Sequence, residues 1–238
     1  MTQLDQLSSE EIAARLSGSP EERAALLREA AEAGLAEAQA VYGQMLLDAQ
    51  NPGEAFGWFW KAARQGHPMA LNMLGRCYDL GWGTRIDKVR AAECFRVAAE
   101  AGLDWGMYNY GSALALGAGL TRDKAAALGW FQKAAAMGHA KSRNFLGSFY
   151  EDGELLARDM DAAAACYAQA AEGGDFRGMF NHARMLAQAG DIEGALLWIG
   201  RCGEAATAPF RDKALAWLAQ VPDMRLRAEG SALLRKEK

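Results

Sequence analysis

Residues 70–83 read ALNMLGRCYDLGWG, and residues 123–139 read DKAAALGWFQKAAAMGH. These two stretches are the two halves of a motif that recurs along the chain with a period of 36 residues. Three series of residues share that period: Gly75, Gly111 and Gly147; Gly66, Gly102, Gly138 and Gly174; and Asp87, Asp123 and Asp159. Independent series with one period indicate a tandem repeat, which decides the fold before any local structure is assigned.

The first and last copies of the motif are shorter than the others. The step from Gly43 to Gly75 is shorter than the period, and Asn51 takes the place of the aspartate in the first copy. In the last copy Ala183 replaces the glycine, and Asp191 follows it at the same spacing as Asn51 follows Gly43. The deletion therefore falls in the same loop in both copies.

Each repeat is predicted to be a pair of helices. In the first helix Ala70, Leu74, Gly75 and Tyr78 share one face. A glycine inside a helix costs about 1 kcal/mol relative to alanine, so we interpret the recurrent glycine as a close contact with the second helix. The Asp and Asn residues are predicted to cap the second helices, and glycines to end them.

These signals predict five helix pairs, and a strong helix start at Ser19 predicts a capping helix before them. The pairs are expected at 36–49 with 52–65, 68–80 with 87–101, 104–117 with 123–137, 140–152 with 159–173, and 176–189 with 192–203. Terminal helices are expected over 20–33, 210–220 and 223–236, with a short helix between residues 8 and 16.

The pattern Ala-x-x-x-Leu-Gly-x-x-Tyr-x-x-Gly-x-Gly, then Asp, then Ala-x-x-Trp-Phe-x-Lys-Ala-Ala-x-x-Gly-His, resembles the Sel1-like repeat, a relative of the tetratricopeptide repeat. The resemblance covers residues 34–203. It implies an all-α fold, a right-handed α-solenoid of about five helix-turn-helix repeats used by adaptors and scaffolds. The units are expected near 34–65, 66–101, 102–137, 138–173 and 174–203, with helical caps over 1–33 and 204–238.

The sequence departs from the family pattern at several positions. Gly106 and Gly178 replace a small alanine, and Cys94 and Cys166 replace a tryptophan. Ala183 replaces the motif glycine. We expect looser packing in these copies.

Composition excludes several classes of function. A hydrophobic content of 51% rules out a wholly disordered chain, and 26 Lys and Arg against 30 Asp and Glu argue against a general nucleic-acid binder. The most apolar segment, residues 110–121, is shorter than the roughly 20 residues of a membrane helix, and residues 1–16 do not read as a signal peptide. We expect a cytoplasmic protein with no nucleic-acid partner and no membrane insertion.

The residues that often carry chemistry occupy structural positions of the repeat. The chain has no Cys-x-x-Cys pair, no Cys–His pair at ligand spacing and no phosphate-binding loop. The cysteines are predicted to lie in the core, and His182 is predicted to point inward and to need a hydrogen-bond partner. We therefore expect no metal, no cofactor and no catalysis, although a hydrolytic enzyme remains a third alternative.

The remaining candidate for function is the surface of the first helices. If these helices line a concave side, the residues beside the Leu-Gly pair face a groove. Asparagine amides there are expected to clamp a peptide backbone, and aromatic and Arg side chains to anchor it. The candidate partner-binding residues are Asn72, Arg76, Trp105, Tyr108, Asn144, Arg177, Phe180 and Arg184.

Besides the hydrolytic enzyme, two functions remain open. The first is a protein- or peptide-binding adaptor or scaffold, in bacterial signalling or envelope regulation. A specific inhibitor or immunity-type antagonist of an enzyme would use the same groove. The polar residues of the face are also compatible with a merely solvated surface, in which case Trp82, at a loop tip, is a second candidate for binding.

Overall fold

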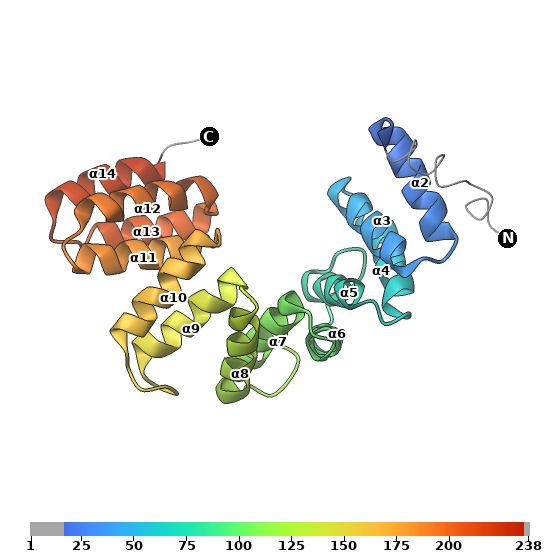
Figure 1. The fold of residues 1–238 in the computed structure, drawn as a ribbon, viewed down its shortest axis with the longest axis horizontal. Helices are drawn as coiled ribbons and strands as arrows, with labels where there is room; N and C mark the ends of the chain where they lie inside the picture. The colour runs from blue at the N-terminus through green and yellow to red at the C-terminus, as the bar shows by residue number, and fades with distance from the viewer. Residues whose placement is uncertain (1–16, 236–238) are drawn as a thin grey trace. The chain divides into compact units, whose positions relative to one another are not determined.

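The computed structural model describes residues 17–235, and within that range the chain is built from α-helices without a strand (Figure 1). The helices are α2 (Pro20–Glu32), α3 (Ala36–Asp48), α4 (Pro52–Ala63), α5 (Pro68–Leu80), α6 (Lys88–Glu100), α7 (Asp104–Leu116), α8 (Lys124–Ala136), α9 (Ala140–Asp152), α10 (Met160–Glu172), α11 (Phe176–Gln188), α12 (Ile192–Ala205), α13 (Ala208–Leu218) and α14 (Met224–Arg235). The helices pack in pairs, α3 with α4, α5 with α6, α9 with α10 and α11 with α12, so the predicted all-α repeat fold is confirmed.

The helix bounds agree with the predicted ones to within two residues at each end. Two connections are short, residues 49–51 and 189–191, whereas the others within helix pairs cover 81–87, 117–123 and 153–159. The deletion in the first and last copies therefore shortens the loop between the two helices of a pair, as predicted. The short helix expected between residues 8 and 16 lies outside the described residues.

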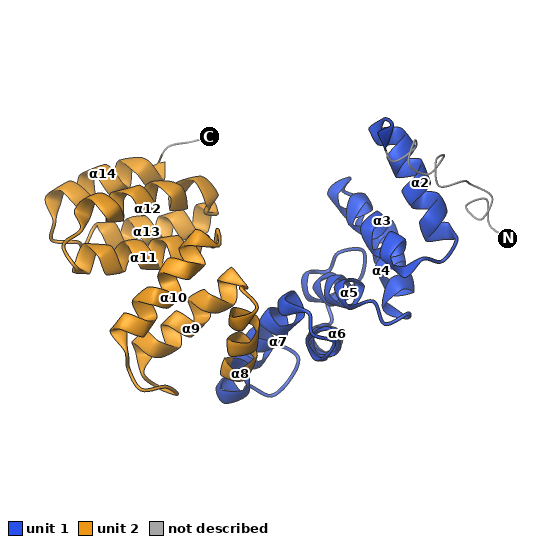
Figure 2. Cartoon of the chain, in the orientation of Figure 1, with its two compact units in different colours: residues 1–127 blue, residues 128–238 orange. Residues whose placement is uncertain are grey.

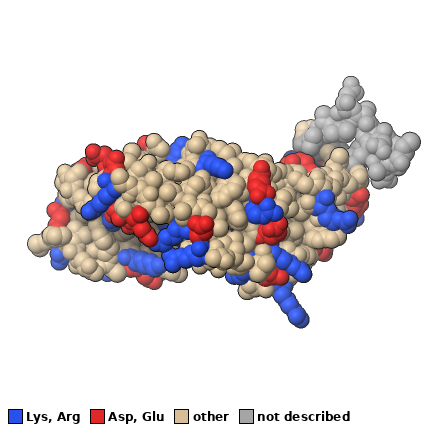
Figure 3. All heavy atoms as spheres, turned by 90° about the horizontal axis from the view of Figure 1, so that it is seen from below, with Lys and Arg blue, Asp and Glu red and all other residues tan. Residues whose placement is uncertain are grey.

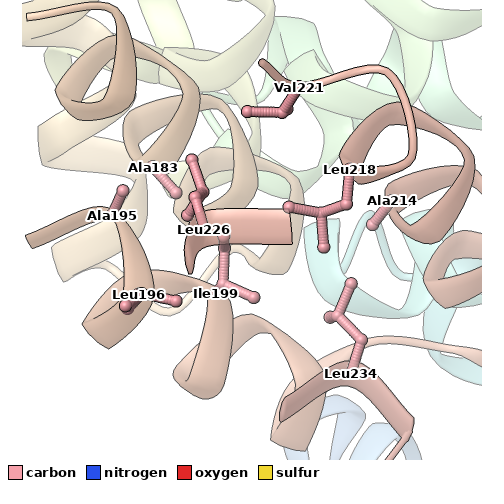
Figure 4. Packing of buried hydrophobic residues seen from close by; sticks show 9 residues of the cluster. All are labelled: Ala183, Ala195, Leu196, Ile199, Ala214, Leu218, Val221, Leu226 and Leu234. Atoms are coloured by element: carbon pink, nitrogen blue, oxygen red, sulfur yellow. The ribbon is translucent and has the colours of Figure 1, made fainter. Parts of the chain in front are cut away.

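The chain forms two compact units, residues 1–127 (unit 1) and residues 128–238 (unit 2), and α8 runs across the boundary (Figure 2). In unit 1 a core of Phe59, Leu74, Cys77 and Phe95 lies between α4, α5 and α6. In unit 2 the largest core joins α11 and α12 to the terminal helices α13 and α14 (Figure 4). Its central side chains are Ile199, Leu218 and Leu226.

Helix caps recur with the repeat. The Oδ1 atoms of Asp87, Asp123 and Asp159 each accept a hydrogen bond from the backbone N–H three residues on, at 3.0, 2.9 and 2.9 Å. These bonds satisfy N–H groups that have no partner within the helix. His67 and His139 cap the first helices in the same way, because their Nδ1 atoms accept from the N–H three residues on.

The motif glycine contacts an aromatic ring of the second helix. A Cβ atom on Gly75 would lie 2.6 Å from the ring of Phe95, and one on Gly147 would lie 2.7 Å from Tyr167. Both rings are buried. The glycine is therefore required for the two helices to approach this closely, which confirms the predicted role of the motif glycine.

The expectation of looser packing at Gly106 and Gly178 is wrong. A Cβ on Gly106 would lie 2.7 Å from the backbone nitrogen of Ala99, and one on Gly178 would lie 2.5 Å from the Cβ of Ala170. Without side chains at these positions, α7 and α11 come closer to the preceding second helices, α6 and α10. The substitution of glycine for alanine thus tightens the contact between repeats.

Two loop glycines also hold neighbouring repeats of unit 1 together. Gly83 and Gly119 have positive φ angles of 68° and 78°, a conformation that favours glycine. A Cβ on Gly83 would overlap the backbone carbonyl of Pro52, and one on Gly119 would overlap that of Lys88. Both carbonyls lie at the start of the second helix of the preceding repeat. These two loops therefore rest directly on the backbone of the preceding repeat.

Two glycines in helix interiors of unit 1 provide a matched test of the helix contact. Replacing a helical glycine by alanine normally gains about 0.5–1 kcal/mol, and Gly57→Ala should show that gain because no atom lies within 4 Å of its Cβ position. Gly75→Ala should instead lower the free energy of unfolding by about 1–3 kcal/mol, since Phe95 must move. Urea unfolding of both variants measures the difference. Equal stabilisation of the two variants would refute the contact.

Candidate protein-binding surface

One face of each first helix points away from the paired second helix. Four residues of each first helix share this face: those six and two positions before the motif glycine, and those one and five positions after it. Their spacings of four, three and four residues place them on one side of the helix. In unit 1 they define what we call the unit 1 stripe. It consists of Glu37, Val41, Gln44 and Asp48 on α3, Met69, Met73, Arg76 and Leu80 on α5, and Trp105, Asn109, Ser112 and Leu116 on α7.

The unit 1 stripe exposes large apolar side chains. Trp105 is 40% exposed and Leu116 is 78% exposed, and three more large hydrophobic residues of the stripe are exposed: Val41, Met69 and Leu80. Single exposed apolar side chains are common on protein surfaces, but their concentration on one face is typical of interaction surfaces.

The corresponding positions in unit 2 are mostly polar. They are Lys141, Phe145, Ser148 and Asp152 on α9, and Arg177, Asn181, Arg184 and Gln188 on α11. None of the large hydrophobic residues exposed among residues 128–235 lies at these positions. The apolar character of the face is therefore a property of unit 1.

Three of the predicted binding residues lie on or beside the unit 1 stripe. The rings of Trp105 and Tyr108 meet edge to face, with centroids 6.2 Å apart. The Arg76 guanidinium lies 4.7 Å from the centroid of the Trp82 ring, and burial lowers its pKa. Trp82 itself is half-buried against the core of unit 1, so it is not a projecting loop tip.

The prediction that Asn72 and Asn144 line a groove is wrong. Both are buried, at 2% and 7% exposure. The Oδ1 atom of Asn72 accepts a hydrogen bond from Asn109 Nδ2 at 2.7 Å, and Asn144 Oδ1 accepts one from Asn181 Nδ2 at 2.8 Å. These residues join neighbouring first helices, because a buried amide requires a hydrogen-bond partner.

Two further candidates, Phe180 and Arg184, are engaged within unit 2. Phe180 meets the rings of Phe210 and Trp217 on α13 edge to face, at 5.6 and 5.3 Å between centroids. Helix α13 thus covers the surface that Phe180 was expected to present. The Arg184 guanidinium forms an ion pair with Glu151 of α9 at 2.8 Å.

Glu151 is the centre of a small polar network. Burial acts to raise its pKa, but hydrogen bonds from Arg184 and from the Tyr167 hydroxyl outweigh burial and hold the pKa below its usual value. The network links α9, α10 and α11, so Arg184 contributes to repeat packing. Of the unit 2 candidates, Arg177 remains exposed, stacked on the rings of Phe176 and Phe210.

The histidines serve the fold. His67 Nε2 lies 2.7 Å from the Glu37 carboxylate, and His139 is buried beside Ser142. His182 packs edge to face on Trp198, and burial lowers its pKa. Its buried Nδ1 atom has no hydrogen-bond partner among the described residues, contrary to the sequence-based expectation.

The cysteines are all free thiols in poorly solvated positions. Cys77 and Cys202 are buried, whereas Cys94 and Cys166 are half-buried in the position that tryptophan takes in other repeats. Burial raises the pKa of Cys77 and of Cys94 to about 11 and that of Cys202 to about 12, and it also raises the pKa of Cys166. A raised pKa keeps the thiol protonated and weakens it as a nucleophile.

Acidic and basic side chains alternate over the face shown in Figure 3 without a continuous area of one sign. None of the described helices has both the length and the apolar character needed to cross a bilayer.

A succession of helix pairs that exposes an apolar face on consecutive first helices defines a repeat protein suited to protein binding. The chain belongs to the Sel1 repeat family. The Sel1 repeat matches residues 36–67, 68–103, 106–139 and 140–175, which together make up more than half of the chain.

Comparisons with individual proteins agree with this family. The chain is 37% identical over 82 residues to DAP3-binding cell death enhancer 1 of Rattus norvegicus, a match that covers 32% of this chain but 16% of that protein. The fold is similar to that of a Sel1 repeat protein from Oxalobacter formigenes, with 28% identity, a TM-score of 0.70 and coverage of 85% of this chain and 60% of that one. It is also similar to c5321, a protective antigen of uropathogenic Escherichia coli, with 27% identity, a TM-score of 0.71 and coverage of 94% and 52%.

The asparagine pair of unit 1 predicts a stability effect. Asn72→Ala removes the acceptor of Asn109 and should lower the free energy of unfolding by about 1–3 kcal/mol. In a double-mutant cycle with Asn109→Ala, the coupling energy should exceed about 0.5 kcal/mol, as expected for residues in direct contact. Chemical denaturation measures all three variants. A coupling energy of zero would contradict the hydrogen bond.

Thiol labelling provides a second check on the side-chain environment. The raised pKa values leave less thiolate at about pH 8, so Ellman's reagent should modify all four cysteines slowly in the native protein. The same thiols should react at once in guanidinium chloride. Rapid native labelling of Cys94 or Cys166 would show that their positions are open to solvent.

Proposed function

We propose that this protein is a non-catalytic adaptor or scaffold that binds a partner protein through the unit 1 stripe. The observation that carries the proposal is the set of five exposed apolar side chains on one face of three consecutive first helices, α3, α5 and α7. Burying such side chains in a partner interface gains roughly 25 cal/mol for each Å² of apolar surface removed from water.

The stripe combines apolar anchors with polar groups at fixed positions. Trp105, beside Tyr108, supplies a large rigid anchor of the kind that dominates binding energy at interfaces. Asn109 uses one amide proton on Asn72, and an asparagine amide can make further hydrogen bonds with a partner backbone. Because the supporting helices are already packed, the surface requires little ordering when a partner binds.

The structural roles of the histidine and cysteine side chains support a non-catalytic function. His67 and His139 cap helices, His182 packs on an aromatic ring, and burial raises the pKa of every cysteine. The rat relative is named DAP3-binding cell death enhancer 1, and a binding activity is also what is proposed here.

Two tryptophans of unit 1 allow a matched test of the surface. Trp105 is 40% exposed on the stripe, and Trp60 is 44% exposed on the second helix α4. A partner captured from a cell extract and identified by mass spectrometry is titrated calorimetrically against both variants. Trp105→Ala should weaken binding by about 2 kcal/mol or more, whereas Trp60→Ala should leave it unchanged, with melting temperatures of both variants close to the parent.

The same titration separates the competing interpretations. Normal binding by Trp105→Ala together with lost binding by Trp60→Ala would place recognition on the second helices and overturn the proposal. If the captured partner is an enzyme that loses its activity in a one-to-one complex, the protein is an antagonist that uses this surface.

A further inference from the structure

Unit 2 contains a recess whose residues do not belong to the unit 1 stripe. Its volume is about 380 Å³, and it is lined by Ala187, Gln188, Trp217, Gln220, Val221 and Pro222. The lining comes from the C-terminal ends of α11 and α13 and from the loop that leads into α14. This volume lies in the range of small ligand pockets, so it accommodates one long side chain.

The walls of the recess are largely apolar and held in place. The Trp217 ring is fixed by its edge-to-face contact with the Phe180 ring. The two ring planes are inclined by 85° to each other. Val221 is buried at the margin of the main core of unit 2 (Figure 4). With Ala187 and Pro222, these residues offer an apolar surface for a hydrocarbon stem beside the Trp217 ring.

Two helix ends and two glutamine amides place partial negative charge and hydrogen-bond acceptors around the recess. Both α11 and α13 end at its edge, and a helix C-terminus carries a partial negative charge. Neither helix has a Lys, Arg or His in its last turn. The side-chain amides of Gln188 and Gln220 add oxygen acceptors, and neither residue is buried.

Two arginines of the chain lie close to this region, Arg227 bonded to a neutral carbonyl and Arg184 paired with a carboxylate. Arg227 donates to the carbonyl oxygen of Val221 at 2.6 and 3.1 Å, so that carbonyl already has a cationic donor. Arg184, one turn before the end of α11, is paired with Glu151. Neither residue lines the recess.

We propose that this recess binds the side chain of a lysine or arginine presented by a partner protein. The aliphatic stem packs against Ala187, Val221 and Pro222, as long basic side chains do on apolar surfaces. The charged end lies against the Trp217 ring as a cation–π contact, with the glutamine oxygens as acceptors. An acidic side chain is disfavoured by the two helix C-termini. The proposal is independent of the unit 1 stripe.

The proposal is tested by NMR titration of the full-length protein with N-acetyl-lysine methylamide. The matched uncharged probe is N-acetyl-norleucine methylamide, which has the same stem without the amino group. The indole N–H signal of Trp217, assigned by its loss in Trp217→Phe, should shift saturably with the lysine probe. The norleucine probe should bind about tenfold more weakly, because it lacks the cation–π contact.

Charge variants at the exposed residue Gln220 sharpen the test. Gln220→Lys should abolish the shift, and Gln220→Glu should tighten binding of the lysine probe several-fold. Gln169→Lys on α10, an exposed glutamine outside the recess, should have no effect. Equal binding of both probes, no shift with either, or normal lysine binding by Gln220→Lys would overturn the proposal, and none of these results bears on the unit 1 stripe.

Discussion

The contact between a motif glycine and an aromatic ring of the following helix is the constraint on which the rest of each repeat depends. At Gly75 and Gly147 the ring occupies the space that a side chain would need. This contact fixes the rotation of the first helix about its own axis, because another orientation would force a side chain into the ring. Every other position of the first helix is thereby assigned to the core, to the next repeat or to the surface.

Contacts between repeats extend this order along the chain. Gly106 and Gly178 let a first helix approach the preceding second helix, and the Asn72–Asn109 and Asn144–Asn181 bonds join neighbouring first helices. Asn72 and Asn144 are buried, so a shift in register would leave their amides without a hydrogen-bond partner in the interior. A helix pair cannot bury its apolar face alone, so these contacts between neighbours are what stabilise a repeat protein. These contacts leave the two ends of the unit 1 stripe on each first helix exposed, whereas Met73 in its middle is buried.

The sequence predicts the repeat fold well because its main determinants are local. Residues within one repeat determine the glycine pattern, the caps at Asp87 and Asp159, and the short loops of the first and last copies. The exposure of Trp105 was also predictable, since it follows from helical register alone.

The sequence fails where the partner of a residue lies in another repeat. Asn72 bonds a residue 37 positions away, and Phe180 is covered by α13, which carries no complete copy of the motif. Asn109 and Asn181 were missed as well, although they are spaced along the chain as Asn72 and Asn144 are. That shared spacing is the one signal that pointed to a pairing. The closer approach at Gly106 was misjudged because the absence of a side chain allows either a gap or a closer contact, and only the structure distinguishes them.

Hydrogen–deuterium exchange of the protein, alone and bound to its partner, tests most directly the claim that the first helices of unit 1 form the binding surface. Slower exchange on binding is predicted in residues 68–80 and 104–116, with little change in residues 88–100 of the second helix between them. Protection confined to residues 52–63 and 88–100, with the first helices unaffected, would contradict the account.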